Sequence, residues 1–202
     1  MKLFDRYADA PEQNDVLMPE DDLHANVAIM TIGELLGKYE RFTREQEELR
    51  AMYPWASRFV LGHPLPVWQR DPTWTLEQKS RFITSIWAGV DIGSYLINDL
   101  FRIVRTPDGH EVMLENSDIV LDGQQRLLAI QSYIESEFPV VDTEGRPRFW
   151  SELSRDERRR FSLYRFTRAT IKSFDEKKLR TAYDLRAFGG TPHREDQRAS
   201  NP

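Results

Sequence analysis

Apolar positions recur at helical spacing in several stretches of the chain, and most of these stretches follow a residue that commonly caps helices. Thr75 and Gln78 stand three positions apart, as in a capping box, and Phe82, Ile83 and Ile86 then share one side of a helix. The same reasoning predicts helices over residues 33–39 after Thr31, 43–53 from the pair Thr43 and Gln46, 76–88, 124–137, a short arginine-rich stretch after Ser154, and 175–186.

Short apolar runs between turn residues predict the strands. Residues 94–100 and 118–122 are expected to be buried strands, and residues 101–105 and 110–114 flank Thr-Pro-Asp-Gly, which is a strong hairpin signal. We expect residues 59–70 and 163–172 to be extended and residues 142–145 to form a second turn. The pattern predicts one α+β domain over 26–190, after an acidic lead-in over 1–25 and before a loose tail over 191–202.

Composition narrows the class of protein. The 202 residues carry 28 Lys and Arg against 33 Asp and Glu, and residues 1–50 hold twelve of the acids and six of the bases. The body of the chain is therefore near neutral, which is not typical of a protein that coats DNA. The chain has no cysteine, so thiolate catalysis, disulfides and cysteine-ligated zinc are excluded. The sequence shows neither a membrane-spanning run nor a secretory signal, and we expect a cytoplasmic protein.

The most informative motif is Asp122-Gly123-Gln124-Gln125-Arg126, at the predicted strand-to-helix junction. Glycine permits a tight turn and a close ligand, and a helix start offers free N–H groups and a positive dipole end to phosphate. Arg126 can add bidentate contacts to phosphate, and Asp122 is placed to hold a metal ion or to accept a proton. The simpler interpretation makes Asp122 a helix cap and Arg126 a surface residue.

Two further clusters and one charge run are candidates for function. Trp68-Gln69-Arg70-Asp71 is either part of a site or a loop anchored by a buried tryptophan, and Gly189-Gly190-Thr191-Pro192-His193 is either a site rim or a helix end with a tail. The Arg158–Arg160 run is more typical of a solvated helix face than of a nucleic-acid patch. The four histidines show no metal-ligand spacing.

Together these clusters resemble a known family, the N-terminal domain of GmrSD-type restriction endonucleases. Its hallmark Asp-Gly-Gln-Gln-Arg is present as Asp122–Arg126, Pro66–Arg70 and the following helix resemble its opening, and 183–190 resembles its later aromatic helix ending in Gly-Gly. The resemblance spans roughly residues 30–195 and implies a ParB/sulfiredoxin-like fold with a short mixed sheet, a β-hairpin and surrounding helices. One position departs from the family, because Ala187 stands where relatives usually carry asparagine.

The resemblance also implies nucleotide chemistry, with ATP or GTP and Mg²⁺. Asp122 would be the base or metal ligand, Gln125 would position water or an acceptor, and Arg126 would neutralise developing charge. The remaining residues carried over for phosphate binding or for closing the site are Gly123, Gln124, Gln69, Arg70, Gly189, Gly190 and His193.

Three functions stay open at this point. The first is phosphoryl transfer, either by a kinase acting on a hydroxyl acceptor such as a modified base in DNA or by an NTPase, in DNA modification or defence. The second is a non-catalytic nucleotide-sensing module of a restriction-type system, which Ala187 would suit. The third is direct DNA nicking. Relatives in restriction systems carry a separate nuclease domain, so we expect DNA and a nuclease or modification subunit among the partners.

Overall fold

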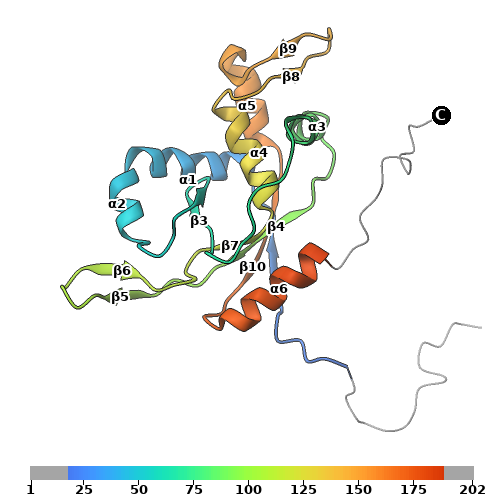
Figure 1. Ribbon diagram of the computed structural model, residues 1–202. Coiled ribbons are helices and arrows are strands. Elements are labelled where there is room, and N and C mark those ends of the chain that lie inside the picture. The colour runs from blue at the N-terminus through green and yellow to red at the C-terminus, as the bar shows by residue number, and fades with distance from the viewer. Residues whose placement is uncertain (1–17, 189–202) are drawn as a thin grey trace, which may run out of the picture.

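The computed structural model describes residues 18–188, and a four-stranded mixed sheet forms its centre (Figure 1). The strands lie in the order β1-β10-β4-β7, in which β10 and β4 are parallel and the two outer pairs are antiparallel. β4 sits inside this sheet and carries four consecutive buried residues, as its apolar sequence predicts. The strands of this sheet are β1 Asn26–Ala28, β4 Ser94–Asn98, β7 Val120–Asp122 and β10 Thr167–Ile171.

Helices cover both faces of this sheet. One face, with Tyr95, Ile97 and Val120, packs against α1, α3, α4 and α5, while Leu96 and Leu121 on the other face pack against α6 (Figure 1). The helices among the described residues are α1 Ile32–Arg44, α2 Gln46–Ala51, α3 Leu76–Trp87, α4 Gln124–Ile134, α5 Arg155–Leu163 and α6 Glu176–Phe188, with a 3₁₀ turn at Trp150–Glu152. The α+β class is confirmed, and the ParB/sulfiredoxin-like assignment stays a prediction.

The capping signals place most helix starts correctly. Thr75 accepts a hydrogen bond from the Gln78 amide at the start of α3, and Ser154 does the same for the Glu157 amide at the start of α5. The helix predicted over 43–53 is present as α2, but its predicted start at Thr43 is wrong. Thr43 lies inside α1, where its hydroxyl donates to the Tyr39 carbonyl, and the chain breaks two residues later at Glu45. A hydroxyl that bonds one turn back cannot cap a new helix.

Three hairpins decorate the core. The predicted hairpin is confirmed as β5 Ile103–Arg105 and β6 Glu111–Met113, joined by the Thr-Pro-Asp-Gly turn, and it projects from the body (Figure 1). The extended segment 59–70 contains the pair β2 Phe59–Val60 and β3 His63–Pro64, and the second turn joins β8 Val140–Val141 to β9 Pro147–Arg148. No helix of residues 18–188 is long and apolar enough to cross a membrane.

The turn between β7 and α4 requires glycine for two reasons. Gly123 has a φ of +97°, and a Cβ placed on it would lie 2.6 Å from the Cβ of Tyr95 on the neighbouring strand β4. The first reason is conformational, since L-residues rarely occupy this region, and the second is steric, since the facing atoms belong to a strand rather than to a flexible side-chain end. The turn therefore fixes the start of α4 tightly against β4.

We predict that Gly123→Ala lowers the free energy of unfolding by about 2–5 kcal/mol, which combines left-handed backbone strain with overpacking. Gly109→Ala is the matched control, because Gly109 also has a positive φ, +90°, but no atom lies within 4 Å of its added Cβ. The control should cost only about 1–2 kcal/mol. Urea unfolding of both variants measures the difference, and equal losses would show that the contact with Tyr95 does not constrain the turn.

Candidate functional site

The Asp122–Arg126 motif lies at the junction of β7 and α4, and its charged side chains contact one another. The Asp122 Oδ2 atom accepts hydrogen bonds from Arg126 Nη2 at 3.2 Å and from Arg186 Nε, on α6, at 3.0 Å. Both arginines are anchored further, Arg126 to the Ile92 carbonyl at 3.0 Å and Arg186 to the Ser94 carbonyl at 2.8 Å. Two guanidinium groups thus converge on one carboxylate.

The simpler interpretation of this motif is wrong on two counts. The residue that caps α4 is Gly123, which has no side chain to bond the helix, and Asp122 instead faces the two arginines. Arg126 is not a surface residue, because its side chain is only 20% exposed. Burial lowers the pKa of Arg126, the Asp122 carboxylate opposes this shift, and the Arg186 guanidinium adds to it.

The start of α4 also leaves backbone donors for a ligand. The Leu127 amide makes the first bond of the helix, to the Gly123 carbonyl at 2.9 Å. The amides of Gln124, Gln125 and Arg126 precede that bond, so they have no acceptor within the helix. Together with the dipole of an eleven-residue helix and two arginines against one aspartate, they give this end of α4 an excess of positive charge.

The Trp68–Arg70 cluster contacts both the strand that precedes the Asp122–Arg126 motif and the helix α6. The Gln69 Nε2 atom donates to the Leu121 carbonyl on β7 at 3.1 Å. The Trp68 ring meets the Tyr183 ring of α6 at 5.6 Å between centroids, and the Arg180 guanidinium lies 4.9 Å from its centre. The first two predicted clusters and α6 therefore lie together.

Three polar atoms in this region are buried with no hydrogen-bond partner among the described residues. They are Trp68 Nε1, Gln69 Oε1 and Gln124 Nε2. Gln69 and Gln124 are only 4% and 5% exposed. Most buried polar groups in proteins have partners, so unpaired ones mark a place where water or a ligand belongs. Two donors and one acceptor form this set.

The other predicted residues have different positions. The Gln125 Oε1 atom accepts bonds from the Thr73 and Trp74 amides, both at 3.2 Å, so its side chain holds the loop before α3. Arg70 is exposed. Gly189, Gly190 and His193 lie outside the described residues. Two arginines of the Arg158–Arg160 run lie over tryptophan rings, Arg158 over Trp150 and Arg160 over Trp87.

This geometry defines an α+β domain in which two arginines and one aspartate meet at the start of a helix. A comparison with protein families shows which family such a chain belongs to. Residues 60–200 match the family model described as GmrSD restriction endonuclease, N-terminal domain. The chain belongs to this family, whose name describes a component of a restriction system. No curated protein and no solved structure matches the chain.

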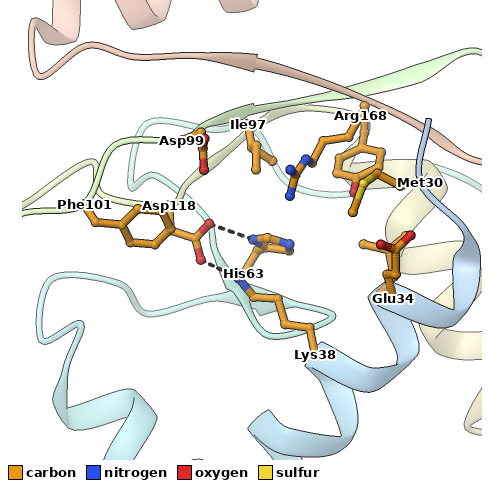
Figure 2. A pocket seen from close by; sticks show the side chains of 11 residues that line it. Met30, Glu34, Lys38, His63, Ile97, Asp99, Phe101, Asp118 and Arg168 are labelled. Atoms are coloured by element: carbon orange, nitrogen blue, oxygen red, sulfur yellow. Dashed lines mark hydrogen bonds and ion pairs between the residues drawn. The ribbon is translucent and has the colours of Figure 1, made fainter. Parts of the chain in front are cut away.

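Sequence reasoning missed a second cluster of charged residues, between α1 and the sheet. The Asp118 carboxylate accepts from Lys38 Nζ at 2.5 Å and lies 3.2 Å from His63 Nδ1 (Figure 2). Asp118 and His63 are 3% and 4% exposed. The partners are 80 and 55 residues away in sequence, and Asp118 was expected to belong to a strand. Instead it has a positive φ of 55° just before β7, which aims its side chain at α1 and β3.

The two buried acid–base groups of this cluster have shifted pKa values. Burial lowers the pKa of His63, Lys38 lowers it further, and Asp118 only partly compensates. Burial alone would raise the pKa of Asp118, but His63 and Lys38 outweigh it and hold that pKa below its usual value. At neutral pH the cluster therefore holds an aspartate anion, a lysine cation and a neutral histidine.

Both shifts make the fold weaker in acid. Because the pKa of His63 is lower in the folded than in the unfolded chain, the unfolded chain binds that proton first, and stability falls as the pH drops below about 6.5. Asp118 adds a second loss below about pH 4. We predict that urea unfolding from pH 7.5 to 5.5 shows the first loss, with a slope of up to about 1.4 kcal/mol per pH unit.

Two variants check the assignment to His63. His63→Gln should remove the loss between pH 7.5 and 5.5, whereas His110→Gln, at an exposed position on the β5–β6 hairpin, should keep it. A His63→Gln protein whose stability still falls over this range would contradict the assignment.

Proposed function

We propose that the junction of β7 and α4 binds the phosphates of ATP or GTP and transfers the γ-phosphoryl group to water or to a hydroxyl acceptor. The observation that carries this proposal is the meeting of two arginines, one carboxylate and a helix start, with Arg126 and Arg186 at 3.2 and 3.0 Å from Asp122. An anion with several oxygens fits such a place, since guanidinium groups and backbone amides both bind oxyanions well.

The buried polar set supports a nucleotide over a simple anion. Trp68 Nε1, Gln69 Oε1 and Gln124 Nε2 are two donors and one acceptor without partners among the described residues. A fully ionised phosphate group supplies acceptors only, while a nucleoside supplies donors and acceptors together. A ligand with a base or sugar beside its phosphates would satisfy more of this set.

Transfer of the γ-phosphoryl group requires few protein groups. The acceptor oxygen bonds to the γ-phosphorus, the bond from that phosphorus to the bridging oxygen breaks, and the nucleoside diphosphate leaves. The acceptor proton goes to Asp122, whose Oδ1 has no hydrogen bond among the described residues, while Oδ2 stays with the arginines. Arg126 and Arg186 would stabilise the charge on the transferred group, which is the main catalytic contribution in phosphoryl transfer.

The described residues at the junction of β7 and α4 do not by themselves form a binding site for the expected Mg²⁺. No group of three His, Asp or Glu side chains among residues 18–188 is arranged to hold a metal ion. Asp122 stands alone with two arginines, which compete with a cation for the same carboxylate. The described residues do not fit a magnesium site on their own. Mg²⁺ therefore stays a prediction, and no step above is assigned to it.

A second function has one specific observation in its favour. Arg186 is one position from Ala187 on α6, where relatives usually carry asparagine, and the same arginine occupies the Asp122 carboxylate. If this ion pair keeps Asp122 from accepting a proton, the site would bind nucleotide but hydrolyse it very slowly or not at all. The chain would then sense nucleotide and pass the signal to a partner of the restriction-type system, such as a nuclease or modification subunit that acts on DNA.

We predict that Arg126→Ala lowers the rate of γ-phosphate release or transfer by on the order of 10³, because it removes a cation aimed at the transferred group. The measurement uses γ-³²P-labelled ATP and GTP with Mg²⁺, in the absence and presence of DNA. Arg105→Ala is the control, since that arginine lies on the β5–β6 hairpin and pairs with Glu111. Near-normal turnover by a folded Arg126→Ala protein would overturn the proposed role.

Asp122→Asn separates the enzyme from the sensor. If the chain is an enzyme, this variant should bind nucleotide with similar affinity and lose turnover, because an amide cannot accept the acceptor's proton. If wild type binds nucleotide and releases no phosphate with or without DNA, the catalytic proposal is wrong and the sensor is supported. Label that enters DNA identifies a nucleic-acid kinase, and free phosphate alone identifies an NTPase.

A further inference from the structure

A second pocket lies between α1 and the sheet, and it contains none of the residues Asp122–Arg126. Its volume is about 130 Å³, and Figure 2 shows charged side chains on several of its sides. Phe101, which lines it, is 53% exposed, so the pocket reaches the surface there. The polar residues that line it are Glu34, Lys38, His63, Asp99, Asp118 and Arg168.

Each carboxylate of this pocket already has a partner. Asp118 is held by Lys38 at 2.5 Å and by His63 at 3.2 Å. The Glu34 Oε2 atom accepts from the Thr31 backbone amide at 2.6 Å and so caps α1. Asp99 has a looser pairing, with Lys172 Nζ at 4.0 Å. Asp118 and Asp99 therefore have cationic partners, whereas Glu34 is held by Thr31 alone.

Arg168 is the cation without a counter-charge. It extends from β10 toward the part of the pocket where His63 lies (Figure 2). No carboxylate of the described residues lies within 4.0 Å of its guanidinium, and its Nε atom is buried with no hydrogen-bond partner among them. A buried unpaired donor is costly, and a guanidinium that faces a pocket in this state is matched by an anion with at least two oxygens.

His63 provides a hydrogen-bond acceptor to a ligand in this pocket. Asp118 is ionised and only accepts hydrogen bonds, so His63 Nδ1 carries the proton that joins them. A neutral histidine protonated at Nδ1 has an acceptor at Nε2, which is directed away from Asp118. A ligand in this pocket therefore meets a double donor at Arg168 and an acceptor at His63.

We propose that this pocket binds a small oxyanion that carries a proton, namely the phosphate group of inorganic phosphate or of a phosphate monoester. Two phosphate oxygens accept from Arg168, and a protonated oxygen donates to His63 Nε2. The volume of about 130 Å³ suits a tetrahedral anion with a few waters, or the phosphate end of a monoester whose remainder stays outside. This proposal does not depend on nucleotide binding at the junction of β7 and α4.

Sulfate is the discriminating probe. It has the same shape as phosphate but carries no proton near neutral pH, whereas inorganic phosphate retains one and a phosphate monoester, whose second pKa is about 6, can take one up on binding. Sulfate would satisfy Arg168 and place an oxygen lone pair against the lone pair of His63 Nε2. Isothermal titration calorimetry of the full chain at pH 7 should therefore show phosphate binding at least tenfold tighter than sulfate binding.

Two variants locate the binding. Arg168→Gln should weaken phosphate binding at least tenfold, and thermal unfolding checks that it still folds. Arg168→Lys keeps the charge without the fork of donors and should give an intermediate affinity. Phosphate bound at the junction of β7 and α4 would not depend on Arg168, so a failure here is distinguishable from a failure of the proposed nucleotide site. Arg105→Gln is the control and should bind phosphate as wild type does, because Arg105 pairs with Glu111 on the β5–β6 hairpin and does not line the pocket.

The source of the phosphate is read from a parallel titration with adenosine 5′-monophosphate. Binding of inorganic phosphate alone, dependent on Arg168, supports a free-phosphate site, and binding of both supports a monoester site. Phosphate binding that is unaffected by Arg168→Gln, or no phosphate binding by wild type, would overturn the proposal. Sulfate that binds as tightly as phosphate would overturn the role given to His63.

Discussion

The close approach of Gly123 to Tyr95 is the constraint on which the candidate site depends. A side chain at position 123 would collide with β4, since its Cβ would lie 2.6 Å from that of Tyr95. Because the turn is held there, α4 starts directly at the end of β7, and Arg126 comes within 3.2 Å of Asp122. The same closeness allows Arg186 on α6 to bond both Ser94 and Asp122. The meeting of two arginines with one carboxylate thus follows from one glycine turn at the end of a strand.

Charge is distributed over the two faces of the sheet in a related way. At the junction, two arginines share one aspartate, and in the second pocket Arg168 has no acid while Lys38 and His63 share Asp118. At the junction the two arginines exceed the one carboxylate, and in the pocket the buried Nε atom of Arg168 has no hydrogen-bond partner among the described residues. Burying such groups without partners is costly, and both proposals rest on this cost.

Local signals predicted much of this fold and the parts of the site that depend on them. The capping boxes at Thr75 and Ser154, the Thr-Pro-Asp-Gly turn and the motif Asp122–Arg126 act through neighbours in sequence. The resemblance to a family added the expectation that Gln69 and Arg70 close the site from the other side, and Gln69 does bond the Leu121 carbonyl next to the motif, whereas Arg70 is exposed.

The remainder depends on contacts between distant residues. The strand order β1-β10-β4-β7 joins the two ends of the described chain, and no periodicity encodes it. Lys38 and His63 reach Asp118 across 80 and 55 residues. The break after α1 falls at Glu45 rather than at Thr43, because Thr43 bonds backward to Tyr39. These features could be identified only from the folded structure, because they depend on residues that are distant in sequence or on a local bond that competes with the capping pattern.

The most direct test of the central claim is to observe where a nucleotide touches the chain. Backbone amide signals of the 23.8 kDa protein can be followed by two-dimensional NMR during titration with a non-hydrolysable ATP or GTP analogue. The account predicts that the largest shifts fall on Gln124, Gln125 and Arg126 at the start of α4. Saturable binding that leaves these three amides unmoved, or no binding of either analogue, would contradict it.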